Sequence, residues 1–187
     1  MTDIDTNWAN YFFSRVSELS QAGIDVSLRA TSRLEGGAIG YYYPHVKIVV
    51  AIRDPDWRAT FVHEYCHFRQ DRSGRKGWDC RAADTDITED MLPAEAEYIA
   101  SQTMLKEFDC DRRALREIKR HSLPIDAAVY AKDANAYALQ ILYSCVSSAQ
   151  VNFSKAFIAA LPGDLKKAPQ MTPEMRAKIE ADAYVED

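Results

Sequence analysis

The stretch from Thr60 to His67 constrains the fold of this chain more than any other part of the sequence. It reads Thr-Phe-Val-His-Glu-Tyr-Cys-His and contains the pattern His-Glu-x-x-His, with histidines at positions 63 and 67. Residues four positions apart lie on the same face of an α-helix, so His63 and His67 can hold one metal ion between their imidazoles. The stretch therefore predicts a metal-binding helix in which Glu64 can accept a proton from a water on the metal.

The residues around this pattern favour a helix with one apolar face. Asp54 and Pro55 predict its beginning, as a capping residue followed by a first-turn proline. One stripe of the helix is apolar except for the glutamate, and it consists of Trp57, Phe61, Glu64 and Phe68. We therefore expect mostly apolar neighbours around Glu64.

The composition indicates a folded chain with a sizeable core. Hydrophobic residues make up 47% of its 187 residues and aromatic residues 11%, which argues against disorder throughout. We expect a single compact domain over residues 1–161, followed by a linker and a C-terminal helix over residues 162–187. The formal net charge of −5 makes nucleic acid an unfavoured partner.

The same sequence predicts a cytoplasmic protein with no membrane partner. Its first residues lack the charged start and apolar core of a signal peptide, and no stretch approaches about 20 uninterrupted apolar residues. The four cysteines are widely spaced and no two form a Cys-x-x-Cys pair. Without a secretion signal, we expect them to be reduced thiols.

The order of the predicted elements indicates an α+β fold. The apolar periodicity predicts a helix over residues 4–22, and alternating patterns then predict a small antiparallel sheet ahead of the metal-binding helix. The predicted strands cover residues 24–28, 38–43 and 46–52, and His45 is expected in the turn after Pro44. A long helix is predicted over residues 93–120, and shorter helices follow it from Pro124, over residues 154–161 and from Thr172. We therefore expect a domain that consists of a small sheet followed by a mainly helical remainder.

A catalytic zinc usually has three protein ligands and one position for water, so His63 and His67 need a third partner. The extended metzincin pattern would place glycine at position 70 and histidine at position 73, whereas this chain has Gln70 and Ser73. The remaining source is a carboxylate on the helix predicted over residues 93–120.

Helical spacing ranks the carboxylates of that long helix. Glu107 shares its face with small and apolar residues and with Asp111 one turn away, and an unpartnered carboxylate is costly to bury there. Glu95 and Asp109 share a polar face, which predicts contact with solvent. Glu107 is therefore the first choice for the third ligand, Glu97 the second and Asp111 the third.

With these residues in place, the chain resembles the gluzincin family of zinc metallopeptidases. The resemblance rests on His63-Glu64-x-x-His67 followed by Glu107-x-x-x-Asp111, and the small sheet ahead of the metal helix is similar to compact minigluzincins. It implies a zincin-like domain with Zn²⁺ held by His63, His67 and Glu107. It also implies that Glu64 is the general base and that Asp111 orients a ligand histidine without itself binding the metal.

The expected activity is hydrolysis of peptide bonds in a peptide or protein substrate. Glu64 would take a proton from the attacking water and pass it to the leaving amine. Tyr137 is our first choice for the residue that stabilises the oxyanion, and Tyr130 is the second. Both tyrosines also fit an apolar helix face.

Two other interpretations stay open at this point. The chain could be a non-catalytic binding or regulatory protein in which zinc only ties two helices together, with Cys110 or Asp111 closing the site. The segment 162–187 could also act as a lid over the cleft. The sequence does not indicate the substrate.

Overall fold

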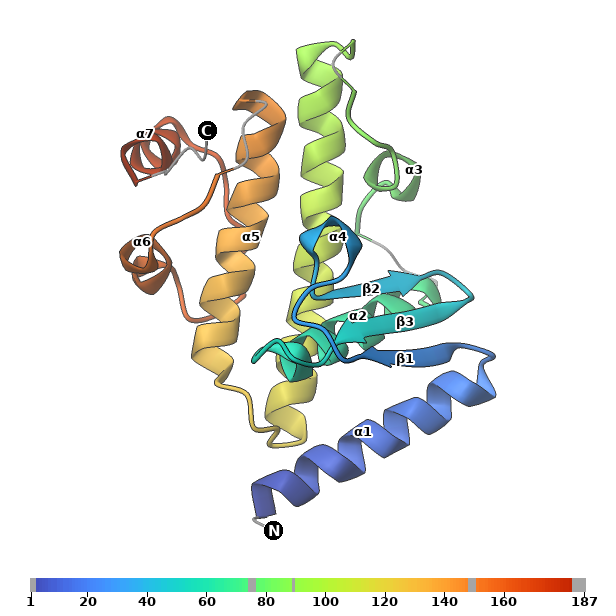
Figure 1. The fold of residues 1–187 in the computed structure, drawn as a ribbon. Helices are drawn as coiled ribbons and strands as arrows, with labels where there is room; N and C mark the ends of the chain where they lie inside the picture. Colours follow the sequence, from blue (N-terminus) through green and yellow to red (C-terminus); the bar gives the residue numbers. More distant parts are fainter. Residues whose placement is uncertain (1–2, 74–76, 89, 148–150, 183–187) are drawn as a thin grey trace. The chain divides into compact units, whose positions relative to one another are not determined.

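The computed structural model describes residues 3–73, 77–88, 90–147 and 151–182 as a mixed α+β chain (Figure 1). The predicted α+β class is confirmed. The chain divides into two compact units, one formed by residues 1–74 and 112–127 and the other by residues 75–111 and 128–187. Helix α4 (Pro93–Arg120) is continuous and passes from the second unit into the first after Asp111.

The first unit contains a three-stranded sheet with the order β1-β3-β2. Strand β3 (Lys47–Ala51) lies in the centre, and residues 48–51 are buried. It runs antiparallel to β2 (Gly40–Tyr43) but parallel to β1 (Asp25–Arg29), so the prediction of an antiparallel sheet is wrong for β1. The tight turn between β2 and β3 makes these two strands antiparallel, and β2 then occupies one edge of β3. β1 pairs with the other edge of β3, where no tight turn imposes an antiparallel direction.

That turn is closed by one backbone hydrogen bond. The Val46 N–H donates to the Tyr43 carbonyl at 3.0 Å across Pro44 and His45. His45 has a φ of 61°, the left-handed conformation that the third residue of a type II turn requires. The prediction of His45 as a turn residue is confirmed.

Two helices pack against this sheet in the first unit. Helix α2 (Trp57–Asp71) contacts β2 and β3, and α1 (Asp3–Gln21) contacts β1 (Figure 1). The predicted start of α2 at Asp54 is wrong by a few residues. The Asp54 carboxylate instead accepts the Asp56 N–H at 2.9 Å and pairs with Arg33 at 2.6 Å, which holds a turn ahead of the helix.

A polar network fixes the face of α2 that carries Tyr65. The Tyr65 hydroxyl donates to Glu18 at 2.7 Å and accepts from Arg69 at 3.1 Å. Arg15 of α1 also donates to Glu117 of α4 at 3.1 Å and lies 3.1 Å from His121. Burial raises the pKa of Tyr65 to about 12, so its hydroxyl keeps the proton that it donates. Helix α2 is therefore held in register against α1.

The second unit is helical in its described part. Besides residues 93–111 of α4, it contains α3 (Cys80–Ala83), α5 (Ala127–Ser147), α6 (Lys155–Ala160) and α7 (Pro173–Asp182). The hydroxyl of Thr172 caps α7, as the sequence predicts, and the hydroxyl of Ser154 caps α6, which begins close to its predicted start. None of the described helices is both long and apolar enough to cross a membrane.

The C-terminal helices of this unit pack on α5. A core cluster joins Ala136 and Leu139 of α5 to Val151, Leu161 and Ile179, and Ile179 is fully buried. The segment beyond residue 161 therefore contributes to the core of the second unit. The last five residues of the predicted 162–187 segment lie outside the described part, and the predicted division at residue 161 stays a prediction.

Candidate metal centre

His63 and His67 face each other across one turn of α2. Their Nε2 atoms lie 3.0 Å apart, with ring centroids 4.7 Å apart and ring planes at 83°. Two imidazole nitrogens at the zinc–nitrogen distance and a tetrahedral angle would be about 3.3 Å apart. The two imidazoles thus face each other, as the spacing predicts, and could hold one metal ion between them.

The orientation of His67 is set by Gln70, which is almost fully buried at 1% exposure. Its side-chain oxygen lies 2.9 Å from Nδ1 of His67. A carboxamide oxygen can only accept, so with this partner the imidazole proton lies on Nδ1, and Nε2 carries the lone pair that faces His63 and could bind a metal. Gln70 thus takes the supporting role that metal-bound histidines generally need from a neighbour.

The sequence pattern predicted only that Gln70 excludes a metzincin, and this role of Gln70 was not predicted. The signal was present, since a polar side chain three positions after His67 lies on the same helix face. What the sequence did not show was the burial of that side chain.

Glu64 is 8% exposed and lies on the side of α2 that packs against β2. Strand β2 approaches so closely that a Cβ added to Gly40 would lie 3.1 Å from Oε1 of Glu64 and would overlap the methyl group of Thr60. Phe61 and Phe68, the expected apolar neighbours one turn away, are both buried. The glutamate is therefore held in a largely apolar setting beside a glycine of the sheet edge.

Cys110 completes a group that could hold a metal ion. Within the described residues, ligand atoms of His63, His67 and Cys110 all lie within 4.8 Å of one another, and Cys110 is fully buried. Cys110 belongs to the turn of α4 that leads into Arg112, where the first unit's part of this helix begins. Imidazole and thiolate together are a donor set that suits zinc, although they do not identify the metal.

The three carboxylates ranked from the sequence do not belong to this group. Glu107 is half-buried on α4, and Glu97 is exposed and lines a cavity in the second unit. Asp111 is 4% exposed and accepts a hydrogen bond from the Tyr130 hydroxyl at 2.6 Å. The assignment of Glu107 as a metal ligand stays a prediction. The assignment of Asp111 as a residue that orients a ligand histidine also stays a prediction.

The two tyrosines nominated for oxyanion stabilisation differ in their surroundings. Tyr137 is 47% exposed on α5. Tyr130 is half-buried and is tied to Asp111 by its hydroxyl. The nomination of Tyr137 stays a prediction.

Comparison with protein-family models, curated proteins and solved structures gave no match.

Proposed function

We propose that this chain is a zinc-dependent metallopeptidase in which Glu64 is the general base. The observation that carries the proposal is the combination on one helix of a facing histidine pair and a buried glutamate between them. A site that binds zinc only for structure has no use for a carboxylate at this position. The gluzincin resemblance of the sequence adds to the proposal.

The residues of α2 divide the chemistry between them. His63 and His67 would hold zinc, and Gln70 would keep His67 in the tautomer that binds. Bound zinc would polarise the scissile carbonyl and acidify a water. Glu64 would take the proton from the attacking water and deliver it to the leaving amine.

Strand β2 supports a peptide as the substrate. It is an edge strand of the sheet, so one side of its backbone is not used by β3. An extended peptide can pair with such an edge by backbone hydrogen bonds. Because Gly40 of β2 lies against Glu64, a peptide paired with this strand would pass close to the general base.

Replacing Glu64 tests the enzymatic role. Glu64→Gln should bind zinc in the wild-type ratio but lose hydrolysis of unfolded, fluorescently labelled casein by about a hundredfold or more, since general-base catalysis is removed. The matched control is Glu35→Gln, a change of an exposed glutamate in the same unit, which should keep full activity. Activity that persists in Glu64→Gln would remove Glu64 from the mechanism, and a wild-type chain that binds zinc but cleaves nothing would refute the peptidase proposal.

The position of Cys110 favours a second candidate function, a closed zinc site that only stabilises the fold. A buried thiolate beside two histidines is a ligand set also found in structural sites, and such sites leave no position for water. In that case zinc would tie α2 to α4, and the chain would act as a binding or regulatory protein.

The third ligand separates the two functions. If Glu107 is the ligand, Glu107→Ala should lose most of the bound zinc and Cys110→Ala should keep it. If Cys110 is the ligand, the reverse should hold, and the cobalt-substituted protein should show a sulfur-to-cobalt charge-transfer absorption that disappears in Cys110→Ala. If both variants lose zinc and the wild type has no peptidase activity, the closed structural site is favoured.

A further inference from the structure

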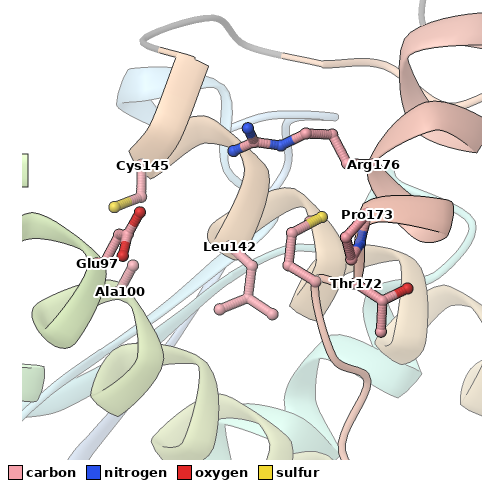
Figure 2. A pocket seen from close by; sticks show the side chains of 8 residues that line it. Glu97, Ala100, Leu142, Cys145, Thr172, Pro173 and Arg176 are labelled. Carbon is pink, nitrogen blue, oxygen red and sulfur yellow. The ribbon is translucent and has the colours of Figure 1, made fainter. Parts of the chain in front are cut away.

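A cavity of about 400 Å³ lies in the second unit, and none of the residues that line it is used in the proposed mechanism (Figure 2). Its wall is formed by α4, α5 and the beginning of α7. The residues that matter for its chemistry are Glu97, Ala100, Leu142, Cys145, Met171 and Arg176. The volume is within the range of sites that enclose a small molecule.

The floor of this cavity is apolar. Leu142 of α5 points into it beside Ala100 of α4 (Figure 2). Met171, ahead of α7, also lines the cavity. Ala100 is 1% exposed, whereas the other two are half-buried. An apolar group of a ligand would cover Leu142 and Met171 and so remove their remaining surface from water.

Two opposite charges border the floor. Arg176 extends from α7 toward the side of the cavity that carries Cys145 and Glu97 (Figure 2). Neither Glu97 nor Arg176 forms an ion pair within the described residues, and Arg176 is half-buried. A half-buried guanidinium with no anionic partner among the described residues can form a charge-assisted hydrogen bond with a ligand carboxylate.

The Cys145 thiol is the third polar group of the wall. Burial and the negative charge of Glu97 raise its pKa, so it stays a neutral thiol at neutral pH. The cavity therefore offers one anion, one cation and an apolar floor, with no further charge from the cysteine.

We propose that this cavity binds a zwitterion with an apolar body, namely an α-amino acid with an aliphatic side chain. Its carboxylate is bound by Arg176, its ammonium group by Glu97, and its side chain by Leu142 and Met171. Such a ligand pairs with both charges at once, whereas an ion of a single charge pairs with only one of them. The site does not depend on the proposed peptidase activity.

Three related molecules test this assignment on the full-length chain. They are L-leucine, 4-methylpentanoate, which lacks the ammonium group, and L-leucinamide, which lacks the carboxylate. L-Leucine should shift the backbone amide NMR signals of α4, α5 and α7 residues around the cavity. The other two should bind about tenfold or more weakly, because each leaves one charge unpaired.

Two variants test the residues themselves. Arg176→Gln and Glu97→Gln should each weaken L-leucine binding by about tenfold or more. Lys178→Gln on α7 and Glu95→Gln on α4 are the matched controls, since both residues are exposed and neither lines the cavity, and binding should be unchanged in both. Glu97 is exposed, so its replacement should leave the fold intact even if Arg176→Gln does not fold.

Several results would overturn the proposal. One is the absence of shifts with L-leucine up to about 10 mM, a concentration at which even a weak specific site would be filled. Others are shifts located elsewhere in the chain, equal binding of the three molecules, or unchanged binding in Glu97→Gln.

Discussion

At the scale of single residues, the candidate metal centre includes a glutamine whose side chain contacts a histidine and is not among the possible ligands. The carboxamide of Gln70 fixes which nitrogen of His67 carries the proton. In the proposed site, an imidazole with the proton on Nε2 could not bind a metal through that atom. The proposal therefore makes metal binding by the pair depend on a third residue of the same helix.

Replacing Gln70 should reveal this dependence. Gln70→Met keeps a similar volume but removes the acceptor for His67 Nδ1, so zinc affinity should fall by about 10–100-fold. Gln70→Glu keeps an acceptor at the same place and should retain most of the affinity. Competition with a chromophoric chelator measures both, and equal affinities for Gln70→Met and the wild type would show that Gln70 is not needed.

At the scale of elements, strand β2 and helix α2 meet at Gly40. A side chain at this position would overlap Thr60 and press on Glu64, so the close approach of strand and helix requires glycine. The polar contacts of Tyr65 hold the helix in register against α1. Glu64 is therefore held between a helix whose register is fixed and a strand that carries no side chain there.

Gly40→Ala should consequently destabilise the first unit by about 1–3 kcal/mol, the usual cost of overpacking. The added methyl group should also displace Glu64 and lower any peptidase activity. Thr60→Ser removes the overlapping methyl group and should restore part of the stability when combined with Gly40→Ala, which a double-mutant cycle in urea would show.

The control for this change is Gly77→Ala, because a Cβ at Gly77 would meet nothing within 4 Å. That variant should unfold like the wild type. A Gly40→Ala chain as stable as the wild type would mean that β2 and α2 can move apart at little cost.

At the scale of the whole molecule, the chain contains two compact units that share the continuous helix α4. The histidine pair belongs to the first unit, and the cavity with Glu97 and Arg176 belongs to the second. The C-terminal helix α7 contributes the fully buried Ile179 to the second unit's core. Deleting α7 would therefore disturb that core, whether or not the segment also acts as a lid.

Ile179→Ala measures this contribution. The change leaves a cavity in the core cluster and should lower the free energy of unfolding by about 2–5 kcal/mol. Ile87→Ala is the control, since Ile87 is 43% exposed in the same unit and should cost much less. Thermal unfolding followed by circular dichroism checks both, and a loss in Ile179→Ala no larger than in Ile87→Ala would show that α7 is only loosely attached.

Local patterns in the sequence were enough to predict much of this structure. Helix α4 has the predicted bounds because Pro93 and the basic residues at its end are local signals. His63 and His67 meet because helical spacing alone places them on one face, and the caps of α6 and α7 are set by residues within one turn.

Features that join distant residues were decided only by the tertiary structure. The parallel pairing of β1 with β3 depends on which edge of β3 is left open. Cys110 joins the histidines, and Arg176 borders the same cavity as Glu97, only because separate helices bring them together. The sequence by itself determined the helix and its two histidines, since a spacing of four residues is a property of one helix. The thiol that could complete the metal-binding group, and the cavity, depend on packing between helices, which no local spacing encodes.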